Sequence, residues 1–168
     1  MNADEFKQTF LPLHRRLYRA AYALLGNAQD AEDMVQETYL KLWNRRNELD
    51  IRSNIPAYCV ATVRNLCFSL MQTKRYQSEE QLPERTELSE NDNPEQQLEK
   101  RDEQAQLKAL ITGLPPQQRK VLWLRDVNEC SFEEIEHATG LNAVNIRVTL
   151  SRARQRIREQ FNRITGKE

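Results

Sequence analysis

The sequence predicts an all-α protein made of two small helical domains. Only four glycines occur in 168 residues, and runs of β-branched residues are few, which argues against a sheet-based fold. Apolar residues recur at helical spacing along most of the chain. Residues 77–94 break this pattern with two prolines, many acidic residues and almost no apolar side chains. We therefore expect a three-helix domain over residues 1–76, a flexible acidic linker over residues 77–94, and a four-helix domain over residues 95–168.

Composition narrows the class of protein. The hydrophobic fraction of 39% and the charged fraction of 30% fit a soluble helical protein with a modest core. No apolar run has transmembrane length and the N-terminus lacks a signal-peptide pattern, so we expect a cytoplasmic protein with no membrane insertion. Cys59, Cys67 and Cys130 form no CxxC pair. The first two lie on apolar helix faces and are predicted to be buried thiols; nothing supports a redox sensor.

The formal net charge of zero conceals an uneven distribution. Residues 1–76 hold 11 Lys and Arg against 8 Asp and Glu, residues 77–104 hold 3 against 10, and residues 105–168 hold 11 against 7. Two mildly basic blocks therefore flank a strongly acidic connector.

The first predicted helix covers about residues 3–25 and ends at Gly26-Asn27. Pro12 lies inside this range and is expected either to kink the helix or to delay its start. Its basic cluster is interpreted as solvated charge: Arg15, Arg16 and Arg19.

The second predicted helix, Asp30 to Trp43, has two chemically different faces. Its buried face is expected to hold Ala31, Met34, Val35, Thr38 and Leu42. Its outward face carries acids and amides with one leucine among them: Asp33, Gln36, Glu37, Leu40 and Asn44. An apolar side chain within an acidic face suggests a partner, although acidic residues in a first turn also suit the helix dipole.

A divalent metal site is the alternative for this face, since Asp30, Asp33 and Glu37 share it. The sequence offers no second acidic cluster and no catalytic histidine to complete such a site. We therefore expect no metal, no cofactor and no catalytic residue.

A polar loop from Arg45 leads to a third helix, which Pro56 is expected to open at its first position and which should end near Arg75. Its core side is predicted to contain Val60, Val63, Cys67, Leu70 and Met71. Its remaining surface mixes bases, an amide and an aromatic ring: Arg64, Asn65, Phe68, Lys74 and Arg75. This mixture suits single-stranded nucleic acid, although a core position is favoured for Phe68.

The C-terminal domain is expected to begin with a helix from about Glu95 to Thr112 that ends at Gly113. Its buried residues are predicted to be Leu98, Leu107, Leu110 and Ile111. The next helix should start at Leu114-Pro115-Pro116 and end near Asn128.

The stretch from Ser131 to Arg158 is typical of a helix-turn-helix. Ser131 and Glu134 have capping-box spacing, Gly140 supplies the positive φ of a sharp stop, and Asn142 is a suitable cap for the next helix. The buried stripe of that second helix is predicted to be Ile146, Leu150, Ala153 and Ile157, and fraying is expected after Phe161.

The opposite side of the second helix has the chemistry that major-groove reading requires. Guanidinium groups reach guanine edges and phosphates, and small side chains let the backbone approach. The predicted DNA-facing residues are Arg147, Val148, Ser151, Arg152 and Gln155, with Arg154, Arg156 and Arg158 on the flanks.

Three segments, in this order, resemble those of bacterial RNA polymerase sigma factors of the extracytoplasmic-function group. DAEDMVQETYLKLW looks like the family's core-polymerase-binding helix, and AYCVATVRNLCFSLMQTKR looks like its promoter-melting and −10-reading helix. LPPQQRKVLWLRDVNECSFEEIEHATGLNAVNIRVTLSRAR looks like its −35-reading domain. The similarity covers nearly the whole chain. Two departures are Tyr58, where tryptophan is common, and Asn128-Glu129, where glycine is frequent.

The resemblance implies a sigma factor that directs the polymerase core to promoters without catalysis of its own. Its implied partners are promoter DNA, the clamp of the largest polymerase subunit, the flap of the second largest subunit, and an anti-sigma factor. The residues implied to contact the clamp are Asp33, Gln36, Glu37 and Leu40. Those assigned to the −10 element are Leu49, the loop Asp50–Asn54, Thr62 and Asn65, with Lys74 and Arg75 beside them. Those at −35-contacting positions are Arg147, Val148, Ser151 and Arg152, to which the helical projection adds Gln155 and Arg154.

Two other function classes remain open on sequence alone. A stand-alone helix-turn-helix regulator would use the N-terminal helices for dimerisation or sensing, and would bind duplex DNA tightly without polymerase. A metal-dependent nuclease would use the carboxylates between Asp30 and Glu37, and the missing second carboxylate cluster counts against it.

Overall fold

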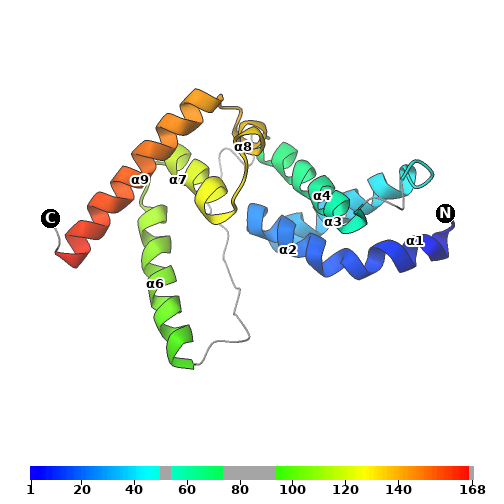
Figure 1. Ribbon diagram of the computed structural model, residues 1–168, viewed down its shortest axis with the longest axis horizontal. Coiled ribbons are helices and arrows are strands. Elements are labelled where there is room, and N and C mark those ends of the chain that lie inside the picture. The colour runs from blue at the N-terminus through cyan, green and yellow to red at the C-terminus, as the bar shows by residue number, and fades with distance from the viewer. Residues whose placement is uncertain (50–53, 74–93, 167–168) are drawn as a thin grey trace. The chain divides into compact units, whose positions relative to one another are not determined.

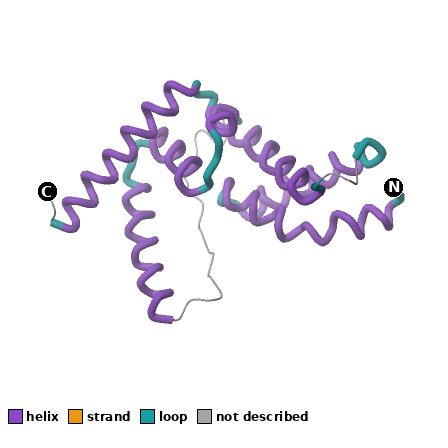
Figure 2. The backbone as a smooth tube through the Cα atoms, viewed as in Figure 1, coloured by secondary structure: helices purple, strands orange, loops and turns teal. Residues whose placement is uncertain are grey.

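The computed structural model describes residues 1–49, 54–73 and 94–166, with residues 94–101 described by their backbone only. All regular secondary structure within these ranges is helical, which confirms the all-α prediction (Figure 2). The helices form two compact units, Met1–Glu84 and Arg85–Glu168. The predicted linker lies almost wholly outside the described residues. No helix in the described part of the chain is long and apolar enough to cross a membrane.

The N-terminal unit begins with an interrupted helix (Figure 1). Helix α1 (Ala3–Phe10) passes through a 3-10 turn, η1 (Leu11–Leu13), into α2 (His14–Leu25). The break falls at Pro12, because proline lacks the backbone N–H of a continuous helix. The single predicted helix over residues 3–25 is therefore two helices. Gly26 ends α2 with φ of 66°, as its position suggested.

Helices α3 (Ala28–Asn44) and α4 (Ile55–Met71) complete this unit, and each starts at an asparagine cap. Asn27 accepts from the backbone N–H of Asp30 at 2.9 Å, and Asn54 accepts from that of Ala57 at 3.2 Å. Two predicted bounds of the third helix were wrong. Pro56 is its second residue, because Asn54 already caps the helix before Ile55, and the helix ends at Met71 instead of near Arg75.

The core of the N-terminal unit lies where α2, α3 and α4 pack together. Its almost completely buried side chains include Leu17, Ala21, Ala31, Val35, Thr38, Leu42, Cys59, Val63, Cys67 and Phe68. The predictions of two buried thiols and of a core position for Phe68 are confirmed. Met34, Val60 and Leu70, which were assigned to the core faces, are only half-buried. Phe6 of α1 adds an aromatic contact, with its ring centroid 5.1 Å from that of Trp43.

The C-terminal unit consists of α6 (Pro94–Thr112), α7 (Pro116–Leu122), the π-helical turn η2 (Trp123–Val127), α8 (Phe132–Thr139) and α9 (Ala143–Thr165). Buried Arg119 joins two of these elements by donating to the backbone carbonyl of Thr112 at 3.1 Å. Two predictions were wrong. Leu107 is 47% exposed, since Ile111 and Leu114 fill the core at that end of α6. Helix α9 continues to Thr165 instead of fraying after Phe161.

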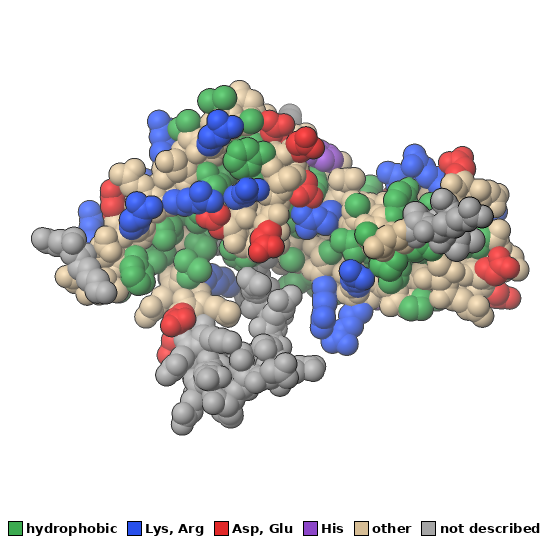
Figure 3. Space-filling view, in the orientation of Figure 1, with side chains coloured by type: hydrophobic (Ala, Val, Ile, Leu, Met, Phe, Trp, Pro, Cys, Tyr) green, Lys and Arg blue, Asp and Glu red, His purple; other side chains and the backbone are tan. Residues whose placement is uncertain are grey.

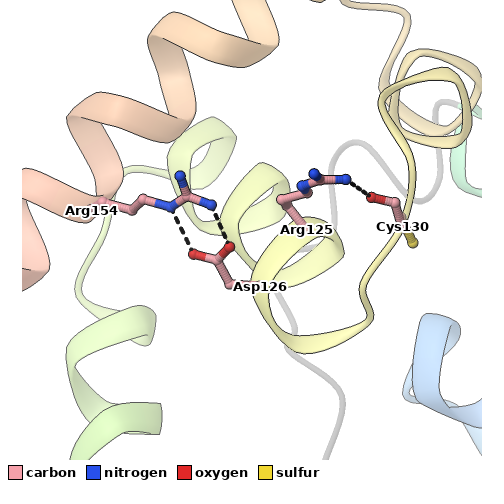
Figure 4. A network of polar contacts seen from close by, with 4 residues as sticks. All are labelled: Arg125, Asp126, Cys130 and Arg154. Carbon is pink, nitrogen blue, oxygen red and sulfur yellow. Dashed lines mark hydrogen bonds and ion pairs between the residues drawn. The ribbon is translucent and has the colours of Figure 1, made fainter.

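The turn η2 shapes the surface that α9 presents. Its widened hydrogen bonding includes a 3.1 Å bond from the N–H of Asn128 to the carbonyl of Trp123. Glu129 follows with φ of 54°, the one non-glycine residue with positive φ among the described residues. Within this turn, Asp126 points toward Arg154 of α9 and Arg125 points toward the carbonyl of Cys130, as Figure 4 shows.

Candidate functional site

Helices α8 and α9 form the predicted helix-turn-helix. In the capping box, the Ser131 hydroxyl accepts from the N–H of Glu134 at 3.1 Å, and the Glu134 carboxylate accepts from the N–H of Ser131 at 2.9 Å. Gly140 ends α8 with φ of 76°, and the Asn142 side chain accepts from the N–H of Asn145 at 2.8 Å to start α9. The sequence therefore identified both helix caps and the turn glycine of this motif, but not the Thr139 hydroxyl, which accepts from the N–H of Leu141 at 3.2 Å.

Burial fixes which side of α9 faces solvent. Ile135 and Ala138 of α8 are fully buried, as are Ile146, Leu150 and Ala153 of α9, while Ile157 is half-buried. The five predicted DNA-facing residues are all exposed: Arg147, Val148, Ser151, Arg152 and Gln155. Four of these five line an open hollow of about 450 Å³, together with Val144. Helical projection had not selected Val144, although it lies one turn before Val148 and on the same stripe.

A second hollow of about 370 Å³ adjoins the first and is rich in arginine. Its lining comprises Arg125, Phe132, Arg147, Leu150, Ser151, Arg154 and Arg158. Two cations lie near the Phe132 ring, whose centroid is 4.9 Å from the guanidinium carbon of Arg125 and 5.9 Å from that of Arg147. Figure 3 shows a row of basic side chains on this face of the C-terminal unit. Arg125 and Phe132 precede α9 in the chain, so spacing within α9 gave no signal for them.

Arg154 is held by an acidic partner on η2 (Figure 4). Its Nη2 donates to Asp126 Oδ1 at 2.6 Å and its Nε donates to Oδ2 at 3.0 Å. The hydrogen bonds to this carboxylate raise the pKa of the Arg154 guanidinium further above its usual range. The neighbouring Arg125 instead donates to the backbone carbonyl of Cys130 at 2.8 Å. The sequence predicted Arg154 on the flank of the exposed α9 face, and the side chain is exposed there, but the sequence did not predict this ion pair.

A third hollow of about 400 Å³ lies on the other flank of the exposed face. It is lined by Gln118, Arg152, Gln155, Arg156, Glu159, Gln160 and Arg163. The amide of Gln155 is engaged there, since it donates to Glu159 at 3.3 Å. Arginines therefore border both sides of the central stripe that holds Val144, Val148 and Ser151. A helix inserted in a groove between two phosphate backbones requires this distribution of charge.

The N-terminal unit presents the acidic face that the sequence indicated on α3. Asp33, Gln36 and Glu37 are exposed, and Leu40 among them is 58% exposed. On the opposite side, Ala31, Val35, Thr38 and Leu42 are buried. Within the described ranges, no group of three His, Cys, Asp or Glu side chains has the arrangement needed to hold a metal ion.

The residues assigned to the −10 element differ in exposure: some are on the surface and others are buried. Asn65 is exposed on α4, and Tyr58 lies on the same stripe with 41% of its surface exposed. Leu49 is half-buried, and the Asn54 side chain is used as the cap of α4. Thr62 is only 8% exposed and donates its hydroxyl to the carbonyl of Tyr58 at 2.8 Å, so the structure does not present it on the surface. The rest lie outside the described residues: 50–53, Lys74 and Arg75.

The capped α8, the turn at Gly140 and the basic face of α9 define the chain as a helix-turn-helix protein. Comparison with protein families identifies it further. The model of sigma-70 region 2 matches residues 10–76, and the model of sigma-70 region 4 matches residues 104–157. The chain belongs to the sigma-70 family, and several of its curated relatives are sigma factors of the extracytoplasmic-function (ECF) group.

Among these relatives, the ECF RNA polymerase sigma factor SigE of Mycolicibacterium smegmatis is 31% identical over 86% of this chain and 56% of its own length. The RNA polymerase sigma-E factor of Streptomyces avermitilis is 28% identical over 94% of this chain and 85% of its own length. The chain spans about half the length of some of these relatives, covering 56% of SigE and 49% of SigG of Mycobacterium tuberculosis. A solved structure of the sigma factor RpoE in complex with the anti-sigma factor NepR from Bartonella quintana is similar at a TM-score of 0.44. That similarity covers 95% of this chain and 98% of RpoE at 25% identity.

Proposed function

We propose that this protein is a sigma factor that directs the RNA polymerase core to specific promoters. The observation that carries the proposal is the α9 surface, where Arg147, Val148, Ser151 and Arg152 are exposed together behind a capped helix-turn-helix. Arginine forks recognise guanine edges in the major groove, and the hollows on either side offer guanidinium groups to the phosphates. The domain proposed for this contact covers residues 95–168 and binds the −35 duplex.

We further propose that residues 1–76 form the domain that binds the polymerase core. Asp33, Gln36 and Glu37 surround Leu40 on α3, so that one apolar anchor is bordered by charged and amide groups. This arrangement fits a protein interface with an apolar centre and a polar rim. We assign it to the clamp of the largest polymerase subunit, in keeping with the matched sigma-70 region 2.

The same domain is proposed to hold the −10 element as single strand. Tyr58 and Asn65 supply an aromatic ring and an amide on one exposed stripe of α4. A ring on which a base stacks and an amide that bonds a base edge are the groups that unpaired bases require. Extruding a base costs a few kcal/mol, which contacts in such a pocket must offset. Thr62 takes no part in this proposal because its side chain is buried.

The protein itself performs no chemistry in this role; it acts in the cytoplasm by binding and positioning. Each domain is only mildly basic, so each should bind DNA weakly alone. Linking both to the polymerase makes the second contact intramolecular and raises the combined affinity without new contacts. The proposed partners are therefore the polymerase core and promoter DNA. An anti-sigma factor and the flap of the second largest subunit are proposed from family membership alone.

The test is reconstitution with purified core polymerase. We expect the full chain to bind core in a pull-down and to start run-off transcription on a subset of randomised promoters. Core polymerase alone should give no promoter-specific transcript. In a gel shift without polymerase, the chain should bind a selected promoter poorly at physiological salt. Failure to bind core, together with tight duplex binding by the chain alone, would instead establish a stand-alone regulator.

A further inference from the structure

Two valines stand out on the exposed side of α9. Val144 is 62% exposed and Val148 is 41% exposed, although the core contacts of this helix are made by Ile146, Leu150 and Ala153. Neither valine belongs to the buried core of the unit. Phe161 and Ile164 of α9 are also exposed, but of these four apolar residues only the two valines lie among Arg147, Ser151 and Arg152.

The two valines share one site. Both line the open hollow of about 450 Å³, together with Arg147, Ser151 and Arg152. They are four residues apart, which separates them by about 6 Å along the helix axis. Successive bases of one DNA strand are about 3.4 Å apart. Two side chains at this spacing therefore meet base edges one or two steps apart.

The chemistry of the major groove indicates what valines contact there. Base edges in that groove display nitrogen and oxygen atoms, and thymine alone adds a methyl group, at C5. An apolar side chain gains free energy by covering that methyl group. Against the other edges it removes water from polar groups without replacing their hydrogen bonds. Arg147 and Arg152 border the valines and prefer guanine.

We propose that Val144 and Val148 are specificity-determining residues that recognise thymine methyl groups. The duplex element that this chain prefers then contains thymines one or two steps apart, next to at least one guanine. This inference rests on the proposed function, in which α9 enters the major groove of promoter DNA. It adds to that function the base that two particular residues select.

The experiment removes the methyl group from the DNA. Holoenzyme assembled from core polymerase and the full chain first selects its −35 region from randomised duplexes. Each thymine of the selected duplex is then replaced singly by deoxyuridine, which lacks only the C5-methyl group. We expect competitive binding to fall about fourfold at one or two positions, the effect of losing one buried methyl group, and to stay unchanged at the others.

Protein variants assign each methyl group to a side chain. Val148→Ala and Val144→Ala should each abolish the difference between thymine and deoxyuridine at one of the sensitive positions. Ile164→Ala is the matched control, because Ile164 is 64% exposed on the same helix and lies outside the hollow. The Ile164→Ala variant should respond to each replacement of thymine by deoxyuridine as the wild type does.

The possible outcomes distinguish failure of this inference from failure of the proposed function. If every deoxyuridine substitution is silent, or if both valine variants keep the wild-type profile, the inference is overturned while promoter selection stands. If no duplex is selected even with polymerase present, the proposed function fails and the inference fails with it.

Discussion

Arg154 shows how one neighbour changes what a basic residue contributes to a surface. This residue lies in an arginine-lined hollow beside the exposed stripe of α9, yet Asp126 binds it through two hydrogen bonds. The two side chains are 48% and 37% exposed, so the pair should contribute only about 0–1 kcal/mol to folding stability. Its larger effect is to cancel one positive charge where phosphates are expected.

Asp126→Asn should therefore strengthen binding to DNA of random sequence. Freeing one guanidinium is expected to raise duplex affinity several-fold and to steepen the dependence of log K on log salt by about one. Fluorescence anisotropy with the full chain at increasing salt measures both quantities. Asp4→Asn, an equal change of charge on exposed α1, is the control and should have little effect. Weaker binding by Asp126→Asn would show that the ion pair instead holds Arg154 in its contact geometry.

The buried thiols provide a second prediction for single residues. Burial raises the pKa of Cys59 to about 11 and that of Cys67 to about 12, and both side chains are fully buried. The native chain should therefore resist iodoacetamide at pH 7.5, and the chain in guanidinium should react rapidly. Mass spectrometry distinguishes the two results. Rapid alkylation of the native chain would contradict the packing of α4.

The same shifts make stability depend on alkaline pH. In the unfolded chain a thiol loses its proton near pH 8.5, whereas in the folded chain Cys67 keeps it until about pH 12. Between these values the folded state binds more protons, so stability is complete below the unfolded pKa and falls as pH rises, by about 1.4 kcal/mol per pH unit for each thiol. Urea unfolding of Cys67→Ala should show a shallower decline between pH 8.5 and 10.5 than the wild type.

Periodicity and caps predicted most of the helices because their determinants are local. Ser131 with Glu134, Asn142 and Gly140 act within one turn of their own positions, and the helix-turn-helix followed from them. The π turn could not be found in this way. Its residues Trp123–Val127 continue an ordinary helical pattern, and only packing within the unit decides that the hydrogen bonds widen there. Arg125 and Phe132 joined the candidate site for the same non-local reason.

The turn after η2 carries backbone strain that a substitution should relieve. Glu129 has φ of 54°, a conformation that costs a side-chain-bearing residue about 1–2 kcal/mol. Glu129→Gly removes that cost and adds some unfolded-state entropy, so we expect a net gain of about 0.5–1 kcal/mol in unfolding free energy. Urea denaturation measures it.

Glu133→Gly is the matched control, because the same substitution within helix α8 should cost about 1 kcal/mol. A loss of stability from Glu129→Gly would mean that the Glu129 side chain makes a contact worth more than the strain.

At the scale of the whole molecule, charge is divided between two exposed faces for which we propose different roles. The acidic face on α3 holds Asp33, Gln36, Glu37 and Leu40, and the basic face on α9 holds Arg147, Val148, Ser151 and Arg152. Their residues were predicted from helical periodicity, since a helix with one buried side defines its exposed side. The −10 residues were predicted less well. Their positions came from family resemblance, which does not reveal that the Thr62 hydroxyl turns back to its own helix.

If the two faces act separately, variants of each should fail at different steps. Leu40→Ser removes the apolar anchor of the acidic face and should weaken binding to core polymerase roughly tenfold. Its selection of −35 sequences should stay unchanged once core is in excess. Leu11→Ser is the control, because Leu11 is similarly exposed, at 50%, in the same unit but outside α3.

Arg152→Ala should show the opposite pattern. It should bind core as the wild type does and lose about 1–3 kcal/mol of −35-dependent promoter binding, with relaxed preference at one base pair. A core titration in the pull-down and a promoter titration with saturated holoenzyme measure the two steps independently. Loss of both steps in either variant would mean that the faces are not independent, because a contact made by one face alone cannot change the binding step that belongs to the other.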